Sequence, residues 1–304
     1  MITAKQHRTH GQSPDDLDVT HEHPHQRSRG PGDCWHRLSC GHGASIVAPT
    51  PVATPLTHAP PRPALPFRPP TLTAAEDKVV IWKLDDVRAG EKKRLAPGFK
   101  RVAEWAKAEK TVVTMGVICD SLAQPNADDV AWIKANAIEN GGVVEFWHHG
   151  WNHRSWTEAG KQLWEFRGPD VATQAKHLKD AQALFKQTTG LTFHAFGVPY
   201  NQADDATIAA MDAVPEITIW MYPPKNETKR KALGRSLNIE VATGKVSYAQ
   251  FARDYTAKKP TTMMLLQGHC GMWDDNSFRD FVKIATLLKQ DGWTTLTAAQ
   301  YSSK

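Results

Sequence analysis

Residues 79–86 read VVIWKLDD, an apolar run that ends in two adjacent carboxylates, Asp85 and Asp86. Residues 143–153 repeat this design, because the run VVEFW passes directly into HHGWNH, with three histidines within six residues. Both apolar runs are short and rich in β-branched and aromatic residues, which predicts buried strands. Reactive groups in parallel α/β folds collect just past the C-terminal ends of strands, so these two strand ends predict a functional site.

The alternation of short apolar runs and helical patterns continues over residues 77–304. Strands are predicted at 78–84, 111–117, 142–147, 192–197, 216–221, 262–267 and 293–296. Apolar spacing of i, i+3 and i+4 predicts helices at 97–110, 127–140, 170–189, 204–213, 247–256 and 277–290. Strand then helix, repeated along the chain, implies a parallel sheet. Periodicity leaves open whether that sheet is open or closed, but about seven strands suit a (β/α) barrel.

Residues 1–76 have a different composition, with 12 of the 20 prolines, 8 of the 14 histidines and no helix or strand periodicity. Such a segment cannot bury enough apolar surface to offset its ordering entropy. We therefore expect a largely disordered leader or linker, followed by a catalytic domain at 77–304. The thiols and imidazole of Cys34, Cys40 and His42 could bind zinc, but they lack a second ligand pair, so accidental composition is favoured.

Composition excludes several classes of protein. The net charge is +5, but the basic residues are scattered in short mixed runs, which argues against a nucleic-acid partner. No stretch of 18 apolar residues exists, so no membrane span is expected. The first 30 residues lack the apolar core of a signal peptide. Four widely spread cysteines do not form the framework of a small disulfide-rich domain and leave the compartment open.

The two strand ends predict a metal site. Adjacent carboxylates such as Asp85 and Asp86 repel each other unless a cation or proton intervenes, although alone they are more typical of a cap and a solvated acid. His149 and His153, four residues apart, can present two imidazoles to one divalent ion. With Asp86 as the third ligand, the site would be open to water and a substrate oxygen, which suits hydrolysis. Asp85 would then remove a proton from the attacking water.

A general acid is also needed, and the sixth predicted strand ends in Gly268-His269-Cys270. His269 meets the same positional criterion, although a lone histidine there would more often be a buried, hydrogen-bonded group. His177 and His194 fit less well, because the first lies in a predicted helix and the second inside a predicted strand.

With these motifs in place, residues 78–296 resemble the polysaccharide deacetylases, the NodB-homology or carbohydrate esterase family 4 group. The first family motif ends in Asp-Asp, as at Asp85-Asp86, and the second is His-x-x-x-His, as at His149 to His153. The resemblance implies a distorted (β/α) barrel of about seven strands. It also implies that Asp85 is the catalytic base and that Asp86 and the two histidines bind the metal.

Later motifs match less closely. The family's Leu-x-His is similar to Leu266-Gln-Gly-His269, with one extra residue, and implies His269 as the catalytic acid. Its Arg-x-Pro-Tyr is similar to residues 197–200, and implies that the backbone of Tyr200 contributes to the oxyanion hole. Gly197 stands where the family has an arginine that braces the catalytic aspartate, and Arg88 is our candidate substitute. Glu240 is the candidate for the acidic residue that tunes the acid histidine.

The expected function is hydrolysis of N- or O-acetyl groups on a carbohydrate by attack of metal-bound water. Zinc is the expected metal, and cobalt, nickel, manganese or iron could use the same ligands. Flat aromatic rings suit stacking on sugars, which makes tryptophans at predicted strand ends candidate substrate contacts. The candidate contacts are Trp147, Trp151 and Trp273, together with Pro199.

Three alternatives stay open from sequence. One is a carbohydrate-binding pseudoenzyme of the same fold, another a hydrolase of a non-carbohydrate amide, and the third a metal-handling protein based on the His-rich leader. The resemblance implies secretion or a periplasmic location if the start is misassigned, and otherwise the cytoplasm is expected. Sequence leaves the oligomeric state open.

Overall fold

A computed structural model describes residues 78–304. The predicted leader, with Cys34, Cys40 and His42, lies outside the described residues. Within residues 78–304, no helix is both long enough and apolar enough to cross a membrane.

The central element is a sheet of nine strands in the order β8-β7-β6-β3-β2-β1-β12-β9, with β13 added beside β1. All of its pairings are parallel, as the strand–helix alternation predicted. The strands are β1 (Val79–Val87), β2 (Val113–Val117), β3 (Val144–His148), β6 (Ala195–Gly197), β7 (Ile219–Met221), β8 (Lys231–Leu233), β9 (Arg235–Asn238), β12 (Met263–Gly268) and β13 (Thr294–Thr295).

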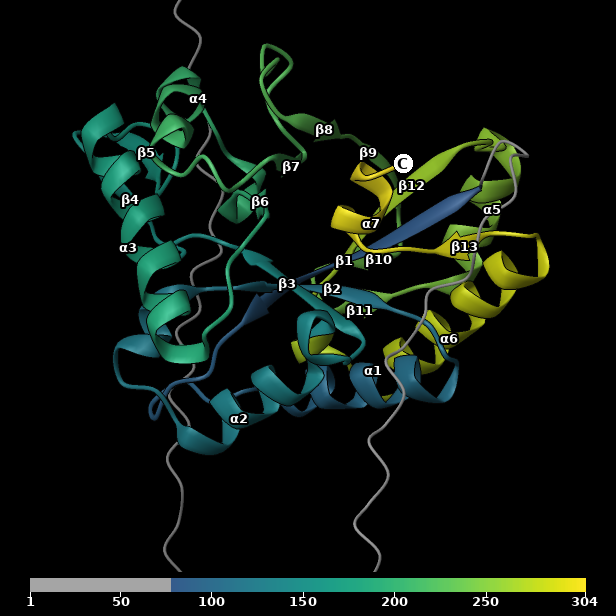
Figure 1. The fold of residues 1–304 in the computed structure, drawn as a ribbon. Coiled ribbons are helices and arrows are strands. Elements are labelled where there is room, and N and C mark those ends of the chain that lie inside the picture. Colours follow the sequence, from purple (N-terminus) through teal and green to yellow (C-terminus); the bar gives the residue numbers. More distant parts are fainter. Residues whose placement is uncertain (1–77) are drawn as a thin grey trace, which may run out of the picture. The chain divides into compact units, whose positions relative to one another are not determined.

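The sheet curls into a nearly closed barrel. Strands β8 and β9 stand at its two ends, yet only Gly234 separates them in the sequence. The two edges of the sheet must therefore approach each other, and Figure 1 shows the resulting curvature. The predicted (β/α) barrel is confirmed.

Helices cover the outside of the barrel, with α1, α2 and α6 along one side and α3 and α4 on another (Figure 1). Their apolar faces pack on the strands through residues such as Phe99 and Phe281, both in the largest apolar cluster. The helices are α1 (Pro97–Ala108), α2 (Ala127–Asn136), α3 (Val171–Thr189), α4 (Asp205–Ala210), α5 (Tyr248–Lys258), α6 (Asp275–Gln290) and α7 (Ala298–Ser302). Short 3-10 turns follow β2, β6 and β12, at Cys119–Ala123, Pro199–Asn201 and Cys270–Met272, and two more follow α2 and α4, at Ile138–Asn140 and Met211–Ala213.

Two antiparallel hairpins stand apart from the main sheet, and the sequence did not predict them. The first pairs β4 (Ser155–Glu158) with β5 (Lys161–Trp164), and the second pairs β10 (Glu240–Ala242) with β11 (Lys245–Val246). Most of their residues are exposed or half-buried, so they lack the apolar alternation that marks a core strand.

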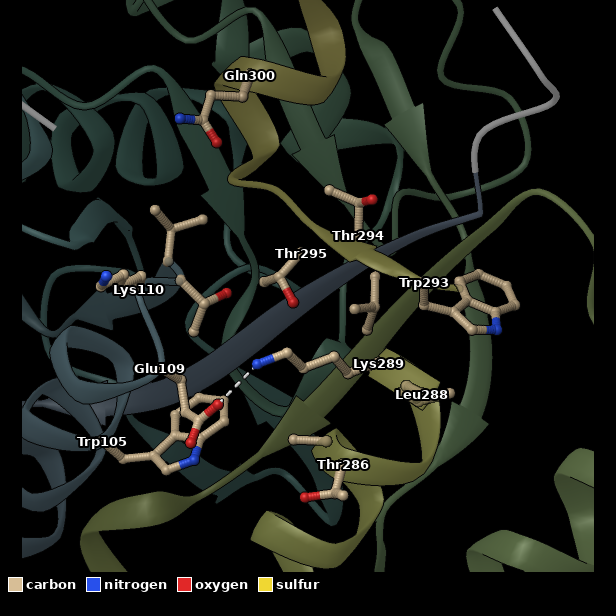
Figure 2. Close-up of a pocket in the computed structure, with 14 residues that line it drawn as sticks. Trp105, Glu109, Lys110, Thr286, Leu288, Lys289, Trp293, Thr294, Thr295 and Gln300 are labelled. Carbon is tan, nitrogen blue, oxygen red and sulfur yellow. Dashed lines mark hydrogen bonds and ion pairs between the residues drawn. The ribbon is translucent and has the colours of Figure 1, made fainter. Parts of the chain in front are cut away.

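A cavity of about 210 Å³ lies near the N-terminal end of β1, where Val80 contributes to its wall. Figure 2 shows Trp105 and Trp293 on its sides and the ion pair between Glu109 and Lys289, whose Oε2 and Nζ atoms are 2.9 Å apart. None of the predicted site residues lines this cavity.

Candidate metal centre

The C-terminal ends of β1 and β3 bring the predicted metal ligands together. The register between β1 and β2 shifts between Leu84 and Val87, so both aspartates lie in an irregular segment of β1. Asp86 has φ of +78°, a left-handed conformation that is uncommon for an aspartate. Such a local distortion re-aims a side chain at the end of a strand.

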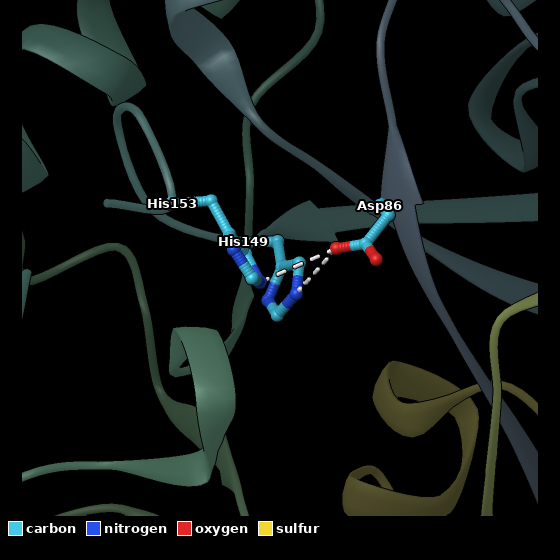
Figure 3. Close-up of side chains that lie close together, drawn as sticks. All are labelled: Asp86, His149 and His153. Atoms are coloured by element: carbon cyan, nitrogen blue, oxygen red, sulfur yellow. Dashed lines mark ion pairs between the residues drawn. The ribbon is translucent and has the colours of Figure 1, made fainter. Parts of the chain in front are cut away.

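Asp86, His149 and His153 offer one ligand atom each within 4.8 Å of one another. The Oδ1 atom of Asp86 is 3.3 Å from Nε2 of His149 and 3.4 Å from Nε2 of His153. Figure 3 shows both imidazoles beside the carboxylate. Oδ1 of Asp86 and Nε2 of His149 are buried and have no hydrogen-bond partner. Because buried polar atoms are normally satisfied, this pair of atoms fits the ligand shell of a divalent cation.

The surrounding backbone sets the orientation of both histidines. Nδ1 of His149 lies 2.6 Å from the carbonyl oxygen of Gly197, which accepts its proton and leaves the Nε2 lone pair free toward Asp86. His153 has φ of +55°, and the Tyr200 hydroxyl donates to its carbonyl oxygen at 3.2 Å. Strained backbone of this kind is typical of functional sites.

Charge states favour metal binding. Burial opposes ionisation of Asp86, but the adjacent imidazoles of His149 and His153 outweigh it and hold the pKa of Asp86 well below its usual range. Burial, followed by the proximity of His149, lowers the pKa of His153 to about 4. At neutral pH the site therefore presents a carboxylate and a neutral imidazole, which are the forms that bind metals.

Asp85 lies beside this trio but makes different contacts. Its side chain is 2% exposed, and both of its carboxylate oxygens accept hydrogen bonds of 2.7 Å from Nζ of Lys83. Gln267 donates a further bond of 2.6 Å to Oδ2, which lies 3.7 Å from Nε2 of His149. The prediction that Arg88 braces Asp85 is wrong, because its guanidinium bonds to Asp120 at 2.9 Å.

His269 follows β12 and is paired with a carboxylate. Its Nδ1 is 2.7 Å from Oε2 of Glu240, while Oε1 of Glu240 accepts bonds from the His269 backbone N–H and from Nε1 of Trp273. Burial lowers the pKa of His269, but the hydrogen bond to Glu240 and the nearby carboxylates outweigh it, so the pKa is raised overall. His269 shares a cavity of about 180 Å³ with Asp85 and Asp86.

The predicted substrate contacts differ in how exposed their side chains are. Trp147 is fully buried, with its ring under the ammonium of Lys83, so it offers no free face and we withdraw it as a sugar contact. Trp273 is 9% exposed and bonds to Glu240 through its indole N–H. Pro199 is buried and Trp151 half-buried. Tyr200 is 44% exposed and has φ of +57°.

Sequence reasoning missed two charged residues that organise the site. Lys83 interrupts an apolar strand two residues before Asp85, which places both on the same strand face, and that spacing was a usable signal. Glu165 is buried and accepts backbone hydrogen bonds from Trp151, Asn152 and His153, so its carboxylate holds the loop between the two histidine ligands. Nothing in the sequence around Glu165 marks that role.

Comparison with known proteins identifies the fold. No family model and no curated protein sequence matches the chain. Among solved structures, a candidate polysaccharide deacetylase from Mycobacterium smegmatis superposes with a TM-score of 0.56 at 14% identity, over 78% of this chain and 93% of that one. The chain has the fold of the carbohydrate esterase family 4 deacetylases.

Two further structures with the carbohydrate esterase family 4 fold differ in activity. One is a family 4 acetyl xylan esterase from Clostridium thermocellum in complex with a cobalt ion, with a TM-score of 0.50 at 15% identity over 73% of this chain and 89% of that one. The other is a family 4 pseudoenzyme from Bacillus anthracis, with a TM-score of 0.50 at 10% identity over 74% and 65%. At such identities the likeness establishes the fold, and the activity has to be argued from the site.

Proposed function

We propose that this chain is a metal-dependent hydrolase that removes N- or O-acetyl groups from a carbohydrate. The observation that carries the proposal is the pair of buried, unpartnered ligand atoms, Oδ1 of Asp86 and Nε2 of His149, beside His153. A carboxylate and an imidazole with different electrostatic surroundings, Asp85 and His269, lie around the same cavity. Such a pair suits a general base and a general acid.

A divalent cation held by Asp86, His149 and His153 would polarise the acetyl carbonyl and acidify water, and zinc is the expected ion. Asp85 accepts a proton from the attacking water as the water oxygen bonds to the acetyl carbonyl carbon. The backbone N–H of Tyr200 stabilises the negative charge on the carbonyl oxygen. His269, whose raised pKa favours its protonated form, donates a proton to the leaving nitrogen or oxygen as the carbon–heteroatom bond breaks.

The substrate class rests on similarity. The Clostridium thermocellum structure is that of an acetyl xylan esterase with a cobalt ion, which supports both an acetylated glycan and a divalent cation for this chain. A half-buried Trp151 and an exposed Tyr200 beside the metal ligands offer aromatic surface for a sugar.

The second candidate function is carbohydrate binding without turnover. Gly197 in place of the motif arginine favours it, as does the existence of a pseudoenzyme with this fold. Acetate release separates the two functions. A hydrolase should release acetate from acetylated chito- or xylo-oligosaccharides, and this release should stop when a chelator is added. A binding protein would release no acetate in either condition.

Two substitutions test the assignment of roles. We expect His149→Ala to abolish metal binding, because it removes a ligand, and Asp85→Asn to keep the metal while lowering turnover by about 10²-fold or more. Metal content and acetate release measure the two effects, with His194→Ala, an exposed histidine, as the control. Near-normal turnover in Asp85→Asn would rule out Asp85 as the base.

A further inference from the structure

Lys83 is a charged residue in the barrel interior. Its side chain is 0% exposed, and its ammonium lies 4.7 Å from the ring centre of Trp147 and 5.3 Å from that of Tyr222. Removing an ammonium from water costs several kcal/mol unless good partners replace the water. The two hydrogen bonds to Asp85 and the two aromatic faces supply those partners.

The space for Trp147 and Lys83 depends on Gly197. A Cβ atom at position 197 would lie 3.0 Å from Cε of Lys83 and 2.6 Å from Cζ3 of Trp147. The backbone of Gly197 does not adopt the left-handed conformation that favours glycine. The glycine is therefore required for its lack of a side chain. The position that differs from the family motif is the position that makes room for the lysine and for the Trp147 ring against which its ammonium lies.

Gln267 is the second donor to Asp85, and two neighbouring side chains fix the orientation of its amide. Its Oε1 accepts from Nδ2 of Asn201 at 3.2 Å and from the guanidinium of Arg235. With donors on Oε1, the amide must present Nε2 to Asp85. An ionised carboxylate has about four acceptor positions, of which Lys83 and Gln267 take three, so one is left for water.

We propose that Lys83 is the positioning residue for the catalytic base, performing from β1 the task of the arginine that the family motif places at position 197. This inference rests on the proposed function. Lys83 fixes the carboxylate of Asp85 and keeps one acceptor position aimed at the water. The loss of the motif arginine is thus compensated within the chain, and it is not a mark of lost activity.

The test is a double-mutant cycle on the full chain, with acetate release, metal affinity and urea unfolding as readouts. Lys83→Met should lower kcat by at least about 10-fold, with KM and metal affinity within about threefold of wild type, because the carboxylate is no longer aligned. Lys78→Met is the matched control, because it removes an exposed lysine–aspartate pair just before the same strand. It should leave kcat, KM and metal affinity unchanged.

Adding Lys83→Met to Asp85→Asn should cost no further activity, because the lysine acts only through that carboxylate. The double variant leaves no buried charge unpaired. If Lys83→Met alone fails to fold, comparing the double variant with Asp85→Asn still tests whether Lys83 acts through Asp85. The proposal is overturned if Lys83→Met keeps wild-type kcat, or if the double variant falls well below Asp85→Asn.

Urea unfolding gives a readout that needs no turnover. Lys83→Met should be destabilised and the double variant restored toward wild type, because the single change leaves a buried carboxylate unpaired. Additive destabilisation would overturn the pairing of the two residues. A wild-type protein that releases no acetate but shows this coupling would count against the proposed function and leave the pairing intact.

Discussion

Three carboxylates around the candidate site have three different surroundings. Asp86 faces two imidazoles, Asp85 is held by a buried ammonium and an amide, and Glu240 pairs with His269. The same functional group can therefore serve as ligand, base and modulator, because neighbouring charges decide which form is stable.

The pair of Glu240 and His269 predicts a pH effect. Glu240 helps to raise the pKa of His269, so the proton-donating imidazolium persists to higher pH. In Glu240→Gln that contribution is lost, and the alkaline limb of the kcat/KM profile should move to lower pH. The profile of acetate release against pH measures the shift. Glu227→Gln, which alters a buried glutamate paired with Arg230, is the control and should leave the limb in place.

The candidate metal ligands could be predicted from sequence because Asp86 and His149 stand at the ends of strongly apolar strands and His153 follows His149 at a spacing of four. Their role as ligands stays a prediction until a metal is measured. The role of Lys83 was not predicted because a single lysine in an apolar run does not change the assignment of a strand. Arg88 is close to Asp85 in sequence, but its guanidinium bonds to Asp120 instead.

At the level of elements, the loop that carries His149 and His153 depends on the first hairpin. Glu165 directly follows β5, and its carboxylate accepts N–H bonds of 2.6 Å from both Trp151 and His153. Nδ1 of His177, on α3, lies 3.2 Å from the same carboxylate. The hairpin and α3, which carry no candidate ligand, therefore fix the loop that carries two of them.

Glu165→Gln should weaken metal binding by roughly 10- to 100-fold, because an amide has one acceptor oxygen in place of two and the loop loses backbone hydrogen bonds. Titration of the metal-free protein with zinc or cobalt measures the affinity. Glu158→Gln, an exposed change in the same hairpin, is the control. Equal affinities in the two variants would show that the loop keeps its shape without Glu165.

Elements with apolar periodicity were predicted to within a few residues, whereas the two hairpins, β8, β9 and α7 were missed. Strand β3 is buried along its whole length and helix α3 buries one face, so their sequences carry a strong pattern. Strand β8 has three residues, two of them exposed, and its place is set by pairing with β7. Register of that kind comes from the assembled sheet and leaves no local pattern.

For the molecule as a whole, Glu145 connects the middle of the barrel to the C-terminal helix. It lies on β3, is buried, and accepts N–H bonds from Ala298 and Ala299 at the start of α7. Burial raises the pKa of Glu145 to about 7 from an ordinary 4.5, despite these bonds. The folded protein therefore holds a proton there that the unfolded chain has already lost.

Stability should consequently fall as the pH rises from about 4.5 through 7, because only the unfolded state ionises freely over that range. The full effect is about 3 kcal/mol for a shift of this size. In Glu145→Gln the free energy of unfolding, measured with urea, should depend less on pH between roughly pH 5 and 8, the range in which Glu145 titrates. Glu104→Gln, on the exposed face of α1, should retain the wild-type slope. Parallel curves for all three proteins would contradict the assignment.

The pairing of β1 with β12 has a consequence for how the protein is made. The three candidate metal ligands lie between positions 86 and 153, on β1 or after β3. His269 comes from the strand on the other side of β1, which leaves the ribosome much later. A nascent chain therefore contains all three candidate metal ligands well before it contains the candidate acid, His269.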